Sequence, residues 1–310
     1  MSVDQESARA ESHRASGLAG NPYLLLAMAS LFWSGNHIVG RAIAGIVPPI
    51  GISAARWLLP AIVLWPFARP HLVRDWPRIK SNWRLLLFLG VTGGAIFTVG
   101  QYVGLQYTTA LNVSVLNSLT PIFIVACGAL IFHDRLKPLQ YIGIATSLCG
   151  VLAIVTKLEP RTLFDLTFNR GDIIIVANMA LMGVYSSYLR RLPPLHWLSF
   201  IFVLALISAL CTLPFALWEH FSGFVFQPTW PTVFAVLAVL YVAIFPSVIA
   251  YAAWTRGVEL IGSNHAGPFL HLIPLYSALF ASVFLGEQLM AYHAVGFVLI
   301  LTGVWLAARK

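Results

Sequence analysis

Long apolar stretches constrain this sequence more than any other feature. Ten segments approach or reach the ~20 residues that an apolar helix needs to cross a hydrocarbon layer ~30 Å thick. They lie near residues 22–46, 50–68, 85–107, 110–132, 139–156, 171–189, 195–218, 232–254, 265–285 and 290–307. Of the 310 residues, 59% are hydrophobic and 10% are charged, whereas soluble domains are about half apolar and a quarter charged. The sequence therefore predicts an all-α integral membrane protein with ten transmembrane helices.

The distribution of positive charge predicts the orientation of these helices. Residues 1–21 are polar and mixed in charge, which is typical of a disordered cytoplasmic tail. If both termini are cytoplasmic, the outer loops carry only Lys157, Arg161 and Arg170 of the 19 lysines and arginines. This bias is the positive-inside rule, so the net charge of +8 reports topology and indicates no nucleic-acid partner. We expect a multi-pass protein of a bacterial-type inner membrane.

The chain contains an internal repeat. A shift of 153 residues aligns residues 104–155 with 257–308 without a gap, and its matches fall on prolines, glycines and one acidic position. They include Pro121 with Pro274, Gly143 with Gly296, Gly150 with Gly303 and Asp134 with Glu287. Earlier in each copy the match is looser, with Asn36-His37 opposite Tyr185-Ser186. Five spans are an odd number, so the second copy, 171–308, is expected to be inverted relative to the first, 22–156.

Four stretches carry a resemblance to a known family. They are WSGNHIVGRA (33–42), PPIGISAARWLL (48–59), LNSLTPIFIVACGALIFHDRLKPLQYIGIATSLCGVLAIV (116–155) and IPLYSALFASVFLGEQLMAYHAVGFVLILTGVWLA (273–307). They resemble the EamA-domain family of the drug/metabolite transporter superfamily, and within it the YddG-type amino acid exporters. The first copy departs from the family's Gly-Glu signature at His133-Asp134. The resemblance implies a ten-helix carrier that exports small metabolites, including aromatic or bulky amino acids, by alternating access.

Polar or aromatic side chains at related depths in both copies are candidates for the substrate site, because polar groups inside a span usually face a cavity or another helix. The candidate substrate-binding residues are Asn36, His37, Thr98, Gln101, Asn117, Tyr185, Tyr251, Trp254 and His271. Hydrogen bonding between helices is the alternative role for the polar ones. An interfacial aromatic belt is the alternative for Trp254.

Two prolines are candidate hinges or gates. Proline cannot donate to the carbonyl of residue i−4, so Pro121 frees the carbonyl of Asn117 and Pro274 that of Leu270. In lipid such a carbonyl must face protein, water or substrate, because leaving it unsatisfied costs several kcal/mol. The alternative is that both prolines only shape helix packing.

Two arginines, Arg41 and Arg56, could attract an anionic group of the substrate, or could instead extend to the outer headgroups. No acidic residue lies in the centre of an expected span. A coupled proton would then be carried by His37 or His271, or transport would run down the substrate gradient.

Other function classes lack their usual residues. The sequence contains no HExxH, GxSxG or GxxxxGK[ST] motif, so we expect no catalysis, metal or cofactor. An exporter or flippase of drugs, nucleosides or lipid-like solutes is the alternative to an amino acid exporter, and an intramembrane enzyme is less favoured. Gly90-x3-Gly94 and Gly100-x3-Gly104 predict close helix packing within a monomer, with a dimer contact as the alternative.

Overall fold

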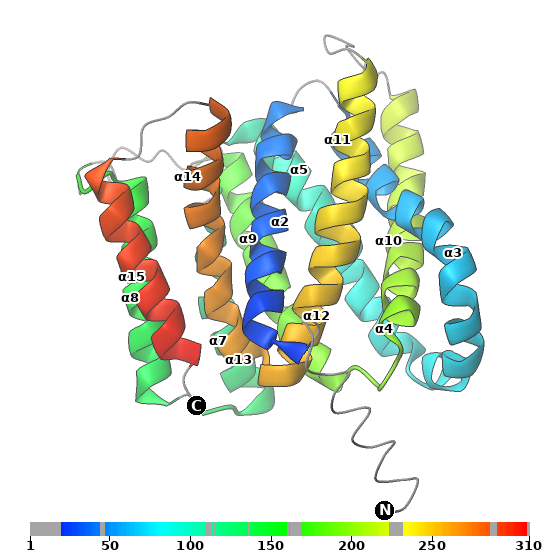
Figure 1. Cartoon of the computed structure of the whole chain (residues 1–310). Coiled ribbons are helices and arrows are strands. Elements are labelled where there is room, and N and C mark those ends of the chain that lie inside the picture. Colours follow the sequence, from blue (N-terminus) through cyan, green and yellow to red (C-terminus); the bar gives the residue numbers. More distant parts are fainter. Residues whose placement is uncertain are drawn as a thin grey trace, which may run out of the picture.

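The structure is a computed structural model of the chain. It describes residues 20–43, 47–108, 113, 116–135, 137–159, 161, 169–222, 232–285 and 290–308, and every regular element within them is helical. The helices stand side by side, and the start of α2 and the end of α15 lie at the same end of the bundle (Figure 1). We call this end the termini end and the opposite one the far end.

Most of the described helices overlap an expected segment. In chain order they are α2 (Pro22–Ala42), α3 (Pro49–Ser81), α4 (Trp83–Leu89), η2 (Gly90–Ile96), α5 (Phe97–Tyr107), α7 (Thr120–Phe132), α8 (Pro138–Val155), α9 (Arg170–Tyr188), η4 (Leu189–Arg191), α10 (Trp197–Phe221), α11 (Thr232–Ile244), η5 (Phe245–Ile249), α12 (Ala250–Ile261), α13 (Ser263–Ala266), η6 (Gly267–His271), α14 (Leu272–Leu285) and α15 (Ala291–Ala308). The main difference is α3, which continues to Ser81 instead of ending near 68. Its polar last turns remain helical beyond the apolar stretch, so hydropathy alone misplaced the end.

Five of the described helical stretches are long and apolar enough to cross a membrane: 49–81, 83–107, 170–191, 197–221 and 236–261. Three more, within α7, α8 and α15, are apolar but shorter. This pattern is that of a multi-pass membrane protein. The expected tail lies outside the described residues, apart from Gly20 and Asn21.

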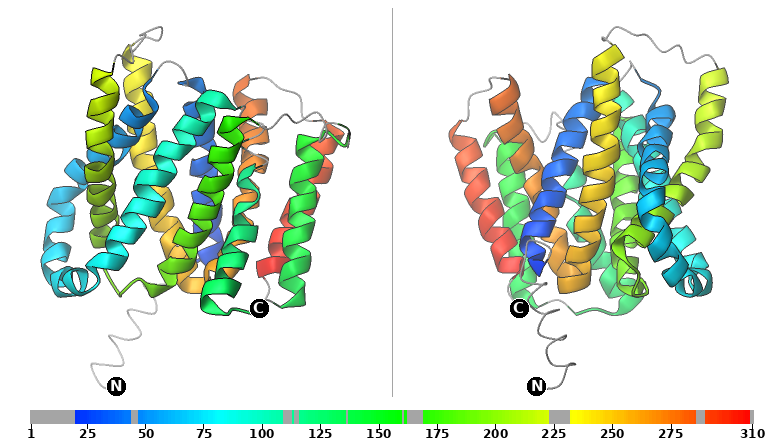
Figure 2. Two further views of the ribbon diagram at one scale, coloured as in Figure 1. Left: turned by 180° about the vertical axis from the view of Figure 1, so that it is seen from behind. Right: turned by 45° about the vertical axis from the view of Figure 1, so that its right-hand side comes forward.

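A glycine seam joins α8 to α15, which lie side by side in both views of Figure 2. A Cβ atom added at Gly143 would stand 2.7 Å from the carbonyl oxygen of Gly303, and one added at Gly150 would stand 2.8 Å from that of Gly296. The absence of side chains at these positions lets the two backbones touch. The contacts run in opposite directions along the two helices, so α8 and α15 are antiparallel.

Reciprocal carboxylate caps join α3 to α10. Glu219, near the end of α10, accepts hydrogen bonds from the backbone N–H groups of Ile50 (3.3 Å) and Gly51 (2.8 Å) at the start of α3. Asp75, near the end of α3, accepts one from the N–H of His196 (2.8 Å), just before α10. A carboxylate complements the free N–H groups and the positive dipole end of a helix. Each helix therefore fixes the start of the other.

The glycine spacings of 90–104 pack within the chain, as expected. Cβ atoms added at Gly90 and Gly94 would meet side chains of α10, and those added at Gly100 and Gly104 would meet side chains of α9. The stretch 83–107 is thus wedged between α9 and α10.

Several helices are interrupted near mid-length. The π-helical segments η2 and η5 interrupt 83–107 and 232–261, and under the 153-residue shift η5 falls opposite 92–96. The candidate hinges Pro121 and Pro274 do not lie inside continuous helices: α7 begins at Thr120, after a turn, and α14 begins at Leu272, after the 3₁₀ segment η6. A proline in the first helical turn removes no hydrogen bond, because N–H groups there have no intrahelical partner.

Candidate functional site

A cavity lies among the interrupted helices. It is small, with a volume of about 30 Å³. Its lining comes from both sequence copies and consists of Trp33, Asn36, His37, Arg56, Phe97, Gln101, Asn117, Thr120, Met179, Met182, Leu270 and Ile273. Five of the residues singled out from the sequence therefore meet in one place: Asn36, His37, Arg56, Gln101 and Asn117.

Arg56 places a buried cation on this cavity. Its side chain is turned inward and the residue is only 2% exposed, so the alternative in which it extends to the headgroups is wrong. No Asp or Glu among the described residues lies within ion-pair distance of it. A charge inside a bundle of membrane helices is costly and is usually paired or functional. An arginine without a carboxylate is therefore the most informative feature of the cavity.

The hydrogen bonds of Arg56 leave capacity for another acceptor. Nε donates to the hydroxyl of Ser247 at 2.6 Å, whereas the terminal nitrogens make only long contacts, to Asn36 Oδ1 (3.3 Å), Tyr102 Oη (3.4 Å) and the carbonyl of Pro246 (3.4 Å). A guanidinium has five N–H donors in a planar fork that matches a carboxylate. The two terminal nitrogens can therefore donate to a stronger acceptor than those they have here.

Segment η5 supplies part of this setting. Trp33 donates from Nε1 to the carbonyl of Pro246 (3.0 Å), the same carbonyl that Arg56 reaches. Ser247 donates to the carbonyl of Val242 (2.6 Å) while it accepts from Arg56. A π-helical turn changes the hydrogen-bonding register of the backbone and is frequent at functional sites. The interruption at 245–249 is thus what turns polar backbone toward Arg56.

Gln101 contributes an unpaired carboxamide. The residue is 1% exposed, lines the cavity, and neither its Oε1 nor its Nε2 has a hydrogen-bond partner among the described residues. Leaving a buried polar group unpaired costs about 1–3 kcal/mol, so such groups are rare unless they serve a ligand. Gln101 offers an unused NH₂ group and an unused carbonyl oxygen in the same lining as Arg56.

The helix break at Asn117 forms another polar part of the wall. The amide nitrogen of Asn117 lies 3.3 Å from Nε2 of His37. Its backbone carbonyl accepts from the Thr120 hydroxyl at 2.7 Å. The carbonyl of Ser118 accepts from Nε2 of His271 at 2.9 Å. These side chains satisfy the carbonyls at the break.

The remaining lining is apolar and was not predicted as a site. It is made by Trp33, Phe97, Met179, Met182, Leu270 and Ile273. Methionine is flexible and polarizable, so Met179 and Met182 suit a wall that adapts to different side chains. In sequence their i, i+3 spacing is indistinguishable from ordinary core packing.

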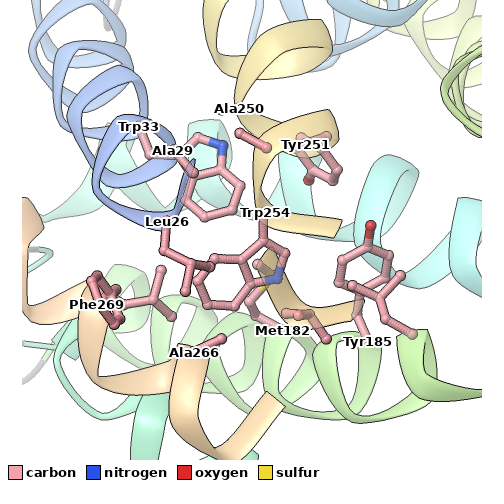
Figure 3. Close-up of a cluster of buried hydrophobic side chains, with 14 of the residues drawn as sticks. Leu26, Ala29, Trp33, Met182, Tyr185, Ala250, Tyr251, Trp254, Ala266 and Phe269 are labelled. Atoms are coloured by element: carbon pink, nitrogen blue, oxygen red, sulfur yellow. The ribbon is translucent and has the colours of Figure 1, made fainter. Parts of the chain in front are cut away.

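Three predicted residues close the cavity toward the termini end instead of lining it. Tyr185, Tyr251 and Trp254 are fully buried and pack with Trp33 in an aromatic layer (Figure 3). Ring centroids are 5.7 Å apart for Trp33–Tyr251, 5.5 Å for Trp33–Trp254 and 6.0 Å for Tyr185–Tyr251. The belt alternative for Trp254 is wrong, because its indole is buried and faces Ser186.

An ion cluster lies at the termini end of the bundle. Arg190 donates to both carboxylate oxygens of Asp134, at 2.9 and 2.7 Å, and to the hydroxyl of Ser263 at 2.9 Å. Asn264 donates to the same carboxylate. The hydrogen bonds from Arg190 hold the pKa of the Asp134 carboxyl below its usual value, so the pair stays charged at neutral pH. The cluster ties the end of α7 to η4 and α13.

Of the other predicted residues, two serve packing. Thr98 donates to the carbonyl of Gly94 and accepts from the indole of Trp57. His271 is fully buried, bonded to Ser147 and to the carbonyl of Ser118. Arg41 lies in the last turn of α2, and its side chain is outside the described part of the structure.

Comparison with known proteins identifies the family. The model of the EamA-like transporter family matches residues 21–156 and 169–309. The chain belongs to the EamA-like transporter family. It is accordingly a membrane transporter and not an enzyme, and the expected resemblance is confirmed.

Relatives of this EamA-like chain bear transporter names. An uncharacterized transporter of Archaeoglobus fulgidus is 28% identical over 93% of this chain and 97% of its own length. A probable terminal-alkyne amino-acid exporter of Streptantibioticus cattleyicolor is 24% identical, over 84% of each chain. A probable amino-acid metabolite efflux pump of Salmonella typhimurium is 23% identical, over 91% of this chain and 93% of its own. A crystal structure at 22% identity superposes with a TM-score of 0.69 and covers 92% of this chain and 96% of that one, which supports the fold.

Replacing Gln101 with leucine should separate stability from function. Because the buried carboxamide has no protein partner, Gln101→Leu should leave the unfolding free energy in detergent unchanged or raise it by about 1 kcal/mol, while substrate binding falls. Thermal unfolding and substrate binding of the same preparation measure the two effects. Thr98→Val is the matched control, because its hydroxyl is bonded: it should lower stability. A clear loss of stability in Gln101→Leu would show that Gln101 is a packing residue.

Proposed function

We propose that this EamA-like transporter exports amino acids with apolar or aromatic side chains across a bacterial-type inner membrane. The observation that carries the proposal is Arg56, a buried guanidinium on the cavity with no carboxylate partner in the described protein. The substrate carboxylate is the missing partner. Two relatives named as amino-acid or amino-acid-metabolite exporters support the same substrate class.

The other walls fit the rest of an amino acid. Gln101 Oε1 is an unused acceptor for the ammonium group, and Gln101 Nε2 is an unused donor. None of the described residues that line the cavity is acidic, so the ammonium is held by neutral oxygens and the site keeps a net positive charge. Trp33, Phe97, Met179 and Met182 offer apolar and aromatic contact to the side chain.

The described conformation is a closed one. Its cavity is far smaller than the ~300–1,000 Å³ of pockets that enclose drug-sized ligands. On the termini end, which we assign to the cytoplasm, the aromatic layer and the Arg190–Asp134 cluster lie between the cavity and the surface. Substrate enters when these contacts separate.

Transport experiments on Arg56 test the proposal. In proteoliposomes, leucine and phenylalanine should compete for uptake of labelled phenylalanine, whereas their decarboxylated amines should not. Arg56→Met should lower apparent affinity by about 10- to 100-fold, because a charge-assisted hydrogen bond contributes about 1.5–3 kcal/mol. Arg56→Lys should be intermediate, because lysine keeps the charge and loses the two-pronged geometry.

The matched control is Arg256→Met, which removes an exposed arginine paired with Glu259 at a helix end. It should transport normally. The proposal fails if the amines compete as well as the amino acids, or if Arg56→Met folds and transports like the unmodified protein.

Alternating access between two inverted five-helix repeats, in ten spans with both termini cytoplasmic, is part of the proposal. Reciprocal contacts support it: Gly143 meets Gly303, and Gly150 meets Gly296. The 153-residue shift relates Gly143 to Gly296 and Gly150 to Gly303, so it converts one contact into the other. His271 bonds the carbonyl of Ser118, its own counterpart under that shift. Equivalent positions touch each other only near a two-fold axis.

Pro121 and Pro274 are the proposed hinges of this movement. Each lies in the first turn after a break, so a substitution that lets the helix continue backward should stiffen the joint. Pro121→Ala and Pro274→Ala should therefore slow transport severalfold while apparent affinity changes less. Uptake rates at saturating and low substrate separate the two quantities. Normal rates in both variants would contradict the hinge role.

The main alternative is an exporter of lipid-like solutes that enter sideways from the bilayer. The α5–α9 contact argues against it in this conformation. The amide of Asn178 donates to the carbonyl of Phe97 at 2.8 Å, and a Cβ at Gly100 would lie 2.4 Å from Asn178 Oδ1. The two helices thus meet closely beside the cavity.

A further inference from the structure

A second hollow, which we call the groove, lies on the other side of the α5–α9 contact from the central cavity. It has a volume of about 780 Å³ and is bounded by η2, α5, α9 and α10, with Ile50 of α3. Its walls include Ile96, Val99, Val103, Ile174, Ala177 and Phe215. The nearby residues Phe97, Gln101, Met179 and Met182 of the same two helices face the central cavity instead. The groove and the cavity are therefore separate sites that share a wall.

The described walls of the groove are almost entirely apolar. Its two polar side chains are already bonded within the protein: Asn178 donates to the carbonyl of Phe97, and Thr212 donates to the carbonyl of Ser208 at 2.8 Å. Ile96, Ala177 and Phe215 are exposed at its rim. A solute that needs hydrogen bonds gains nothing here, whereas hydrocarbon makes favourable contacts with every wall.

The groove lies between helices that cross the membrane. The stretches 83–107, 170–191 and 197–221 are each long and apolar enough to span a bilayer. The medium next to this part of the bundle is therefore the lipid acyl chains. An unfilled hollow of this size would forfeit dispersion contacts along all three helices.

A cation lies one helical turn from the groove wall. Arg170 is the first residue of α9 and is exposed, and Ile174 in the groove wall lies four residues later, on the same helical face. Two carboxylates at this end are engaged within the protein: Glu219 by the N–H groups of Ile50 and Gly51, and Asp172 by the Thr108 hydroxyl and the N–H of Asn169. Arg170 is thus placed to meet a phosphate at the membrane surface.

We propose that the groove binds a phospholipid of the leaflet in which α9 begins, with one acyl chain along Val99, Val103 and Ala177 and the phosphate at Arg170. The acyl chain lies against the wall that α5 and α9 form together. This site is independent of the amino acid site, because neither Arg170 nor Ala177 lines the central cavity.

The test uses phosphatidylglycerol with a photoreactive diazirine in one acyl chain, in nanodiscs that hold the full-length protein. After irradiation, peptide mass spectrometry should find label on the groove segments of α5, α9 and α10 severalfold above label on the exposed residues Val298 and Leu301 of α15. Ala177→Trp should fill the groove and reduce that label severalfold. Leu301→Trp is the matched control and should leave it unchanged.

The headgroup contact has its own measurement. Native mass spectrometry of delipidated protein titrated with phosphatidylglycerol should show about fivefold weaker binding for Arg170→Gln, and no change for Arg256→Gln. Thermal unfolding checks that each variant is folded.

Equal labelling of the groove and α15, or labelling that a folded Ala177→Trp does not reduce, would overturn the acyl-chain site. Unchanged lipid affinity in Arg170→Gln would overturn the phosphate contact. Phenylalanine transport is a separate readout, so either failure is distinguishable from failure of the amino acid proposal.

Discussion

Burying one guanidinium among membrane helices is the constraint on which the central part of this structure depends. A charged residue at the centre of a bilayer costs at least ~2.5–3.5 kcal/mol, and more when it is held away from water. The protein offsets this at Arg56 with a serine hydroxyl, an amide, a phenol and a backbone carbonyl, all neutral. A carboxylate from the protein would neutralise the charge better, and the described residues supply none there. In our proposal the substrate completes this incomplete set.

Interrupted helices make the arrangement feasible in an apolar medium. Continuous helices would turn all their carbonyls along the axis and offer Arg56 only side chains. Segment η5 turns the carbonyl of Pro246 toward Trp33 and Arg56, and the break before α7 exposes carbonyls that Thr120 and His271 satisfy. The same breaks are natural places for movement, since fewer backbone hydrogen bonds must be broken there. Binding and movement therefore use one set of local irregularities.

The sequence predicted the helices well and the roles of individual residues less well. Runs of apolar residues fixed most helix ends to within a few positions, because helix length follows membrane thickness. They could not place the end of α3, where a polar helix continues, or η2 and η5, which leave the apolar pattern intact. Polarity inside a span found Asn36, His37, Gln101 and Asn117 in the cavity. It could not separate them from Tyr185, Tyr251 and Trp254, which pack into the aromatic layer, because that depends on facing helices. The burial of Arg56 likewise depends on Ser247, far away in sequence.

The most direct test of the central claim is a structure of the protein in a lipid nanodisc with bound phenylalanine, determined by electron cryomicroscopy with an antibody fragment as a size marker. The account predicts that the substrate carboxylate lies within hydrogen-bond distance, about 2.7–3.0 Å, of the terminal nitrogens of Arg56, with the ring toward Met179 and Met182. A bound phenylalanine whose carboxylate contacts other residues, while Arg56 keeps only its present partners, would contradict it.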